Sequence, residues 1–351
     1  MKRKVYCGDV AIGGDARVSV QSMLNVNTAD VKAAVEQIAK LQDAGCEIVR
    51  LAVPNMEAAE AFSQIKKSTK MPLVADIHFD YRLAIAAIEN GADKIRINPG
   101  NIGSRENIEK IVRKASEREI PIRIGVNSGS LEKEILRKYG RVTPQGLCDS
   151  VQKNVSILEE LGFENIVVSI KLSDVKLNYE AYKLVHELLP YPLHIGLTES
   201  GSLKKGALKS AIGIGSLLLA GIGDTMRVSL TADPVEEVKL AYEILKDVGL
   251  RNFGVNLISC PTCGRTKINL EALVAKIEEN LPRIEEIRRK KGLEPITIAV
   301  MGCEVNGPGE AKEADFGIAA GMEKAAIFAK GKVLKVVHEK DILEEFFGIL
   351  T

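Results

Sequence analysis

The sequence predicts an eight-stranded parallel (β/α)8 barrel, a TIM barrel, followed by a smaller α/β domain. Eight short runs rich in Val, Ile and Leu alternate with amphipathic helical segments between Val18 and Val248. Eight such units in about 230 residues match the size and strand count of this fold. The alternation stops after Val248, which indicates a second domain. A doubly wound open sheet is the alternative for the first part.

The predicted strands of the barrel are short runs in which apolar residues recur. They span residues 18–23, 48–52, 73–75, 94–97, 122–126, 166–170, 193–197 and 226–230. Between them, apolar residues recur at helical spacing, for example in 31–41, 83–88, 151–161 and 235–245. Glycines at 45, 91, 162 and 249 follow several of these segments, where a left-handed helix cap is expected.

The second domain is predicted to have its own short strands and two helices. We expect strands at 254–258, 296–301, 316–320, 325–328 and 333–337, and helices at 270–291 and 341–349. The boundary falls between residues 251 and 254, so the predicted domains are 1–252 and 253–351. The ligands of the second domain then lie on loops of a compact unit of about 100 residues.

The composition excludes several classes of partner. Forty-eight basic residues against 47 acidic residues leave a formal net charge of +1, so neither a nucleic acid nor a membrane surface is indicated. The apolar run 216–222 is too short to span a bilayer, and the basic start is not followed by the apolar region of a signal peptide. Six cysteines without an export signal indicate reduced thiols in the cytoplasm. Cys7, Cys46 and Cys148 are expected to be small core residues.

Polar residues follow or interrupt the predicted strands where each strand ends, and catalytic groups of this fold come from those ends. They are Arg50, Asp76, His78, Arg96, Asn98, Arg123, Asn127, Lys171, Glu199, Arg227 and Ser229. Five of them are cations, against the two carboxylates Asp76 and Glu199. This imbalance indicates an anion with more than one charge, and a diphosphate fits because Arg forks match phosphate oxygens. Alternatively, two or three of the arginines pair with acidic residues in loops that the sequence does not place.

His78 and Glu199 are candidates for an acid/base pair because both lie at strand ends. The alternative for His78 is a structural role, either capping a strand or pairing with Asp76.

Three cysteines and a glutamate lie on two Gly/Pro-rich loops of the second domain. Cys260 and Cys263 form a Cys-x-x-Cys pair, and Cys303 and Glu310 follow about forty residues later. Soft thiolates select zinc, copper(I) or an iron–sulfur cluster. Three thiols with an available glutamate favour a [4Fe–4S] cluster with one exchangeable oxygen ligand. Zinc and a redox dithiol pair are the alternatives. A radical-SAM site is disfavoured because such a site has its three cysteines in one short loop, which this chain lacks.

Several ordered motifs resemble the hydroxymethylbutenyl diphosphate synthase family of the methylerythritol phosphate route to isoprenoids. The matching stretches run from 19 to about 321 and comprise 21–23, 76–80, 94–101, 123–127, 169–174, 194–199, 221–227 and both cysteine loops. One departure is visible after Gln21-Ser22-Met23. The family usually continues Thr-Asn-Thr, whereas this chain has Leu24 and Val26 at the two threonine positions.

The resemblance implies a TIM barrel followed by a [4Fe–4S] domain whose cluster ligands are Cys260, Cys263, Cys303 and Glu310. The implied substrate is 2-C-methyl-D-erythritol 2,4-cyclodiphosphate, reduced by two electrons to 4-hydroxy-3-methylbut-2-enyl diphosphate. Its implied binding residues are Arg50, Arg96, Arg123, Asn127, Lys171, Arg227 and Ser229. Asp76, His78 and Glu199 match residues near the reacting carbons, and Glu199 resembles the proposed acid/base. The family is homodimeric.

The chain contains no Gly-x-Gly-x-x-Gly motif in a βαβ setting, so its electrons are expected from a partner such as flavodoxin or ferredoxin. Two rival functions stay open at this point. One is a barrel lyase or aldolase acting on a sugar phosphate, with a structural zinc tail. The other is an iron–sulfur sensor or electron carrier, which the phosphate-ready barrel disfavours.

Overall fold

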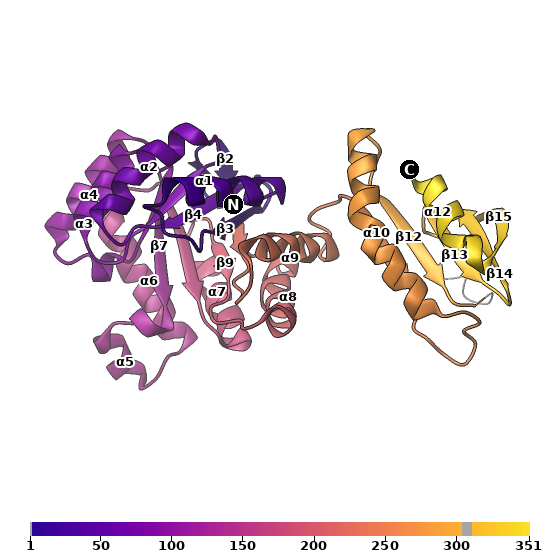
Figure 1. Cartoon of the computed structure of the whole chain (residues 1–351). Helices are drawn as coiled ribbons and strands as arrows, with labels where there is room; N and C mark the ends of the chain where they lie inside the picture. Colours follow the sequence, from indigo (N-terminus) through magenta and orange to yellow (C-terminus); the bar gives the residue numbers. More distant parts are fainter. Residues whose placement is uncertain (1, 304–310) are drawn as a thin grey trace. The chain divides into compact units, whose positions relative to one another are not determined.

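The computed structural model describes residues 2–303 and 311–351, and the chain divides into two compact units, Met1–Arg251 and Asn252–Thr351 (Figure 1). Each unit has its own hydrophobic core. In the described part of the chain, no helix is both long enough and apolar enough to cross a membrane.

The first unit is a parallel barrel, as predicted. Its strands are β3 (Ser19–Met23), β4 (Ile48–Ala52), β5 (Leu73–Asp76), β6 (Lys94–Ile97), β7 (Ile122–Asn127), β8 (Ile166–Lys171), β9 (His194–Gly196) and β10 (Thr225–Arg227). Every neighbouring pair is parallel, and β10 pairs with both β9 and β3. A parallel bridge between Val168 and Leu193 joins β8 to the start of β9. The strands therefore follow chain order around a nearly closed ring, which excludes the doubly wound alternative.

Helices form the outer layer of this unit (Figure 1). They are α1 (Val31–Asp43), α2 (Met56–Ser68), α3 (Tyr81–Glu89), α4 (Arg105–Glu117), α6 (Pro144–Glu159), α7 (Val175–Leu188), α8 (Leu203–Leu219) and α9 (Pro234–Asp247). Short additional helices follow two strands: η1 (Pro99–Asn101) after β6, and η2 (Ser128–Ser130) with α5 (Lys133–Tyr139) after β7. Most helices begin at a side-chain cap; Asp30, for example, accepts a hydrogen bond from the Ala33 N–H.

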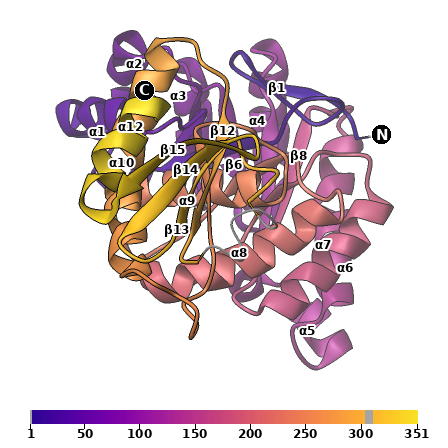
Figure 2. The same cartoon turned by 90° about the vertical axis from the view of Figure 1, so that its right-hand side faces the viewer.

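A β-hairpin closes the amino end of the barrel. Strands β1 (Val5–Cys7) and β2 (Val10–Ile12) are antiparallel, and their apolar side chains pack against Ile48, Val74 and Val167. In both views, the hairpin and helix α5 lie at opposite ends of the unit (Figure 1, Figure 2). The sequence analysis missed this hairpin because segments of three residues carry almost no periodicity. With the amino end filled, the carboxyl end is left as the mouth.

The second unit is a five-stranded sheet in the order β11-β12-β13-β14-β15. Its strands are β11 (Val255–Ser259), β12 (Ile296–Met301), β13 (Phe316–Ala320), β14 (Lys324–Ala329) and β15 (Lys332–His338). The first three are parallel and the last two antiparallel. Helices α10 (Leu270–Lys290) and α12 (Ile342–Leu350), the latter preceded by η3 (Glu339–Asp341), pack through Ile277 and Phe346 against the sheet.

Candidate active site

Polar side chains gather at the carboxyl ends of the barrel strands. Strand residues alternate between the two faces of a sheet, and apolar residues such as Leu51, Ile95 and Ile124 pack in the core with the surrounding helices. The alternation therefore places their polar neighbours on the interior side. These neighbours are Arg50 of β4, Asp76 of β5, Arg96 of β6, Arg123 of β7 and Lys171 of β8.

Asp76 is the centre of an ion-pair cluster. Its buried carboxylate lies 3.4 Å from Arg96 Nη1, 3.9 Å from Arg50 Nε and 3.4 Å from His78 Nε2. Arg96 Nη2 also donates to the Gly125 carbonyl at 3.4 Å. A side chain at position 125 would collide with this guanidinium, because its Cβ would lie 2.5 Å from Arg96 Nε. The structural role considered for His78, pairing with Asp76, is thus present.

Charge determines the protonation state of Asp76. Burial by itself raises the pKa of a carboxyl group. Here Arg50, the hydrogen bond from His78 and the charge of Arg96 outweigh burial and hold the pKa of Asp76 well below its ordinary value. Asp76 is therefore ionised throughout the physiological range, which suits an anchor for cations better than a proton donor.

Arg227 has a carboxylate partner that the sequence analysis did not identify. Glu237, on α9, accepts from Arg227 Nε and Nη2, both at 3.2 Å, and is itself almost fully buried. The alternative of arginines paired with further acidic residues is thus present for Arg227, although its partner lies on a helix and not in a loop. A signal was present in the sequence, because Glu237 shares the buried face of its helix with Ala241 and Ile244.

A thioether lies between two of the arginines. Met23 Sδ is 2.8 Å from Arg50 Nη2 and 3.6 Å from Arg227 Nη1. The next residue, Leu24, is buried in the barrel core, and Val26 packs against that core. The two positions at which this chain departs from the family pattern therefore contribute to packing.

Arg123 and Lys171 are buried cations without an ion-pair partner among the described residues. Burial lowers the pKa of both well below the ordinary value, and neighbouring arginines lower it further. Arg123 Nε and Nη1 make no hydrogen bond within the described part of the chain. A guanidinium keeps its proton in proteins. The free-energy cost of burying the charged Arg123 side chain therefore remains until an anion pairs with it. The mouth therefore carries uncompensated positive charge.

A further polar layer, also missed from the sequence, lies in the barrel interior. Lys94 of β6 and His194 of β9 are both fully buried, and neither Lys94 Nζ nor the ring nitrogens of His194 have a hydrogen-bond partner in residues 2–303 and 311–351. Burial, followed by the charges of Arg123, Lys171 and Lys94, lowers the pKa of His194 well below its ordinary value, so the ring is neutral at pH 7. Burial also lowers the pKa of Lys94, to about 8.

The remaining predicted residues lie at the rim of the mouth. Asn127 and Ser229 are partly buried, and the His78 side chain is about half exposed. Glu199 is exposed and has a positive φ of 54°, a left-handed conformation that costs a non-glycine residue energy. Glu199 lies in the loop that follows β9. Backbone strain of this kind is common at functional positions.

The described parts of the two cysteine loops begin next to each other in the second unit. Strands β11 and β12 are parallel neighbours with Ser259 opposite Val300, so the loops that follow them begin at the same edge. The Gly302 N–H donates to Cys260 Sγ at 3.2 Å, and the Lys267 N–H donates to the Gly302 carbonyl at 3.0 Å. N–H groups pointing at sulfur are typical of thiolate-bound cofactors.

The three thiols differ in exposure: Cys303 is buried, Cys260 intermediate and Cys263 exposed. Backbone hydrogen bonding from Arg265, followed by the Thr266 hydroxyl, lowers the pKa of Cys263 and favours its thiolate. Among residues 2–303 and 311–351, no three Cys, His, Asp or Glu side chains are grouped closely enough to hold a metal ion. Glu310 lies outside the described residues. The donor set and its loops fit a thiolate-ligated group, although the thiols do not meet at one point.

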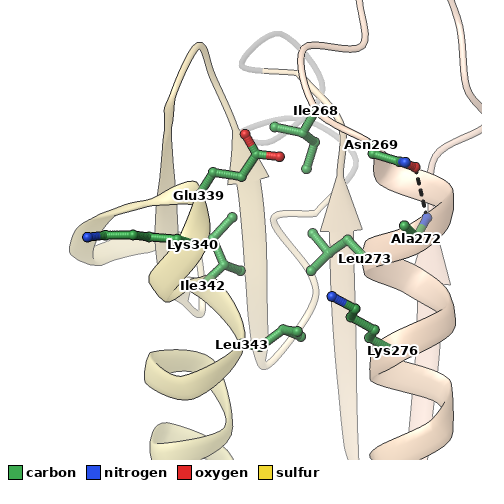
Figure 3. Close-up of a pocket in the computed structure, with 9 residues that line it drawn as sticks. All are labelled: Ile268, Asn269, Ala272, Leu273, Lys276, Glu339, Lys340, Ile342 and Leu343. Carbon is green, nitrogen blue, oxygen red and sulfur yellow. Dashed lines mark hydrogen bonds between the residues drawn. The ribbon is translucent and has the colours of Figure 1, made fainter.

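A hollow of about 470 Å³ lies in the second unit, between α10 and the start of α12. Leu273, Ile342 and Leu343 point toward one another across it, with Lys276 and Glu339 beside them (Figure 3). It contains none of the predicted site residues. Its apolar walls and mixed charges do not resemble the cationic mouth of the barrel.

Comparison with known proteins identifies the family. The model of the GcpE TIM-barrel domain matches residues 2–242, and that of the GcpE protein C-terminal domain matches residues 256–351. A relative from Caldanaerobacter subterraneus subsp. tengcongensis, named 4-hydroxy-3-methylbut-2-en-1-yl diphosphate synthase (flavodoxin), is 56% identical over 345 residues, which is 98% of this chain and 95% of the relative. A relative with the same name from Clostridium perfringens is 55% identical over 348 residues, 99% of this chain and 97% of its own length.

Among solved structures, the type I 3-dehydroquinate dehydratase from Clostridium difficile is similar to this chain with a TM-score of 0.52. It is 16% identical and covers 71% of this chain and 98% of its own. At this identity the similarity extends to the barrel fold alone.

Lys94 generates a testable prediction about stability. Its pKa is about 8 in the folded protein and 10.5 ordinarily, so the folded state binds fewer protons than the unfolded state between these values. The contribution of Lys94 to the free energy of unfolding therefore rises with pH across that window. At pH 7 the buried ammonium lowers the free energy of unfolding. We expect Lys94→Met to raise the free energy of unfolding at pH 7 by about 1–3 kcal/mol, and by less near pH 10.

Urea unfolding of the full chain at both pH values measures this difference. The control is Lys32→Met, at an exposed position of α1, which should change stability little at either pH. A Lys94→Met protein that is less stable than the parent at pH 7 contradicts the prediction.

Proposed function

The chain belongs to the GcpE family of 4-hydroxy-3-methylbut-2-en-1-yl diphosphate synthases, and we propose that the mouth of its barrel binds the cyclic diphosphate that this reaction consumes. The reaction is an oxidoreduction in isoprenoid precursor biosynthesis. It opens 2-C-methyl-D-erythritol 2,4-cyclodiphosphate by taking up two electrons and two protons, and it releases one water.

Buried positive charge is the observation that carries the proposed substrate site. Arg50 and Arg96 share Asp76, and Arg227 has Glu237, whereas Arg123 and Lys171 have no carboxylate within ion-pair distance in the described part of the chain. A diphosphate supplies the missing negative charge, and Arg forks bind its oxygens bidentately. Asn127 and Ser229, at the rim, add neutral hydrogen-bonding groups.

The proposed chemical roles follow from exposure and charge. Asp76 stays ionised between its cations and orients His78, whose ring lies 3.4 Å from it. Glu199 has no carboxylate-binding arginine among its described contacts and projects from a strained loop, so it is free to exchange a proton with a bound substrate. We assign Glu199 the role of acid/base for the departing hydroxyl group and His78 a place beside the reacting carbons.

We propose that Cys260, Cys263 and Cys303, together with Glu310 outside the described residues, hold a [4Fe–4S] cluster. The support is the set of soft donors on two hydrogen-bonded loops and the N–H of Gly302 directed at Cys260 Sγ. Such a cluster supplies low-potential electrons one at a time. In the chain itself, the hydrogen bonds from Arg265 and Thr266 favour the thiolate of Cys263, the form that binds metal.

Flavodoxin is named as the partner in the names of the relatives. We propose flavodoxin, or a ferredoxin of similar potential, as the electron donor of this chain. The sequence has no dinucleotide-binding motif of its own, so reducing equivalents come from another protein.

A homodimer is proposed, and helix α8 supports it. Leu208, Ile212 and Leu219, defined here as the α8 stripe, share one face of the helix and are each more than half exposed. A contiguous exposed apolar surface of this kind often marks a site of interaction with another protein.

The thiols support a reducing compartment, and we propose the cytoplasm. Cys7 and Cys46 are buried free thiols within the barrel unit, and burial raises their pKa values to about 11 and about 12. Cys148 is also buried, and burial raises its pKa, so these three are inert core residues and the three loop cysteines are left for chemistry.

The cluster is tested by metal content together with turnover. We expect anaerobically purified protein to be coloured, to contain iron and sulfide, and to reduce the cyclic diphosphate with a low-potential reductant. Cys260→Ser, Cys263→Ser and Cys303→Ser should each lower the iron content and abolish turnover, because a hydroxyl is a poor ligand for this metal. Cys148→Ser, in the barrel unit, is the control and should keep both. Zinc without iron or sulfide would favour the lyase alternative instead.

Substrate binding is tested at Arg123. Arg123→Met keeps an unbranched apolar stem and removes the guanidinium with its charge, so KM for the cyclic diphosphate should rise about 10- to 100-fold, as expected for lost charge-assisted hydrogen bonds. The melting temperature should not fall, because the variant also removes an uncompensated buried charge. Arg113→Met, on the exposed surface of α4, is the matched control. An unchanged KM would remove Arg123 from the proposed site.

The dimer is tested by Leu208→Glu, which places a charge in the α8 stripe. Sedimentation at micromolar concentration should show a dimer for the parent chain and a monomer for the variant, because an unpaired buried carboxylate is costly at an interface. Met56→Glu, at a partly exposed apolar position of α2, should remain dimeric. A variant that stays dimeric would exclude the stripe from the interface.

A further inference from the structure

Glu237 links three separate parts of the barrel mouth. One of its oxygens, Oε2, accepts from Ser22 Oγ and Arg227 Nε, both at 3.2 Å. The other, Oε1, accepts from Arg227 Nη2 at 3.2 Å and from the Leu230 N–H at 3.0 Å. The side chain is only 4% exposed, so these four contacts are shielded from water. The end of β3, the end of β10 and the start of α9 are thereby held together.

The geometry of the Arg227 pair determines which edge of the guanidinium stays available. Glu237 occupies the Nε and Nη2 edge in a side-on arrangement. The Nη1 group is left on the other side, where it donates to Met23 Sδ at 3.6 Å. A thioether is a weak acceptor, so an anion that reaches Nη1 displaces little.

The hydrogen bond from the Leu230 N–H to Glu237 also affects the position of Ser229. Leu230 is the next residue, and its N–H is fixed by Glu237 Oε1. Strand β10 ends at Arg227, and the chain is next held through the buried Val228 side chain and a backbone hydrogen bond from the Thr231 N–H to the Gly201 carbonyl at 2.9 Å. Between these two points, Glu237 fixes the Leu230 N–H, so the path of residues 228–230 depends in part on a carboxylate that comes from a helix.

We propose that Glu237 is a positioning residue for the diphosphate site: it sets the direction of Arg227 and the path of the chain that carries Ser229. The proposal rests on the proposed function, in which both residues bind the diphosphate. A carboxylate near an anion site also repels the anion. If Glu237 acts by positioning, removing its charge weakens anion binding. If it acts by repulsion, removing its charge strengthens anion binding.

The first experiment replaces Glu237 with glutamine in the holoenzyme and measures binding of inorganic pyrophosphate by calorimetry, together with steady-state turnover. Glutamine has the same shape but turns one acceptor into a donor facing Arg227 or Ser22. We expect pyrophosphate to bind about 10- to 100-fold more weakly. KM for the cyclic diphosphate should rise similarly with kcat changed by less than about threefold, because the lost interaction holds the substrate in ground and transition states alike.

Glu236→Gln is the matched control. It lies next to Glu237 on the same helix, pairs with Lys239 on the surface and should leave both measurements unchanged. Glu237→Asp is the second variant, in case glutamine prevents folding. It keeps the charge but withdraws the carboxylate by one methylene, so positioning predicts weaker binding here as well. Tighter or unchanged pyrophosphate binding in Glu237→Gln, or unchanged binding in a folded Glu237→Asp, overturns the proposal.

A double-mutant cycle separates this inference from the proposed function. If Glu237 acts through Arg227, adding Glu237→Gln to Arg227→Met should weaken pyrophosphate binding by less than about threefold. Weaker binding in Arg227→Met with unchanged binding in Glu237→Gln overturns the positioning role alone. Unchanged pyrophosphate binding and KM in Arg227→Met remove Arg227 from the proposed substrate site, and overturn the positioning role with it.

Discussion

Positive charge enclosed in a barrel of low dielectric is the constraint on which the first unit depends. Asp76 neutralises part of it by pairing with Arg50 and Arg96, and Glu237 neutralises Arg227. Like charges buried in the barrel repel more strongly than they do in water. Each buried carboxylate therefore offsets the cost of burying the arginines with which it pairs. The remaining positive charge defines what the mouth can bind.

The unpaired cations are a cost that the apolar framework must offset. The outward faces of the strands form one continuous core with the helices, and the hairpin β1–β2 fills the amino end with further apolar contacts. That packing holds the polar interior in place without relying on complete charge pairing. Strain and uncompensated charge are commonly concentrated at sites that a ligand later completes, and the left-handed Glu199 fits the same pattern.

Both units place their chemistry at the same kind of location. In the barrel and in the smaller sheet, the proposed site residues follow the carboxyl ends of parallel strands, where adjacent loops begin at one edge. This common geometry explains how residues distant in sequence, such as Cys260 and Gly302, come within hydrogen-bonding distance. Because the proposed ligands lie on two loops, the Cys-x-x-Cys motif by itself left zinc, a cluster and a redox pair as alternatives.

Much of the architecture was predictable because its signals are local. Apolar runs and helical periodicity located all eight barrel strands to within a few residues, and the ordered motifs identified the family correctly. The strand ends carry the polar residues that the sequence analysis selected. Pairing, however, depends on distances between segments, and local patterns contain no such information. The Arg227–Glu237 contact joins a strand to the buried face of a helix, and the hairpin is too short to show a period.

The sequence by itself determined the fold class, the family and the residue types available for binding an anion and a thiolate-ligated group, because each of these is encoded in local pattern and composition. Only the tertiary structure decided which cations are neutralised and which are not. It also showed that Lys94 and His194 are enclosed without hydrogen-bond partners among the residues that the structure describes. Burial and charge compensation are properties of the assembled barrel, since they arise from groups on several strands that meet only after folding.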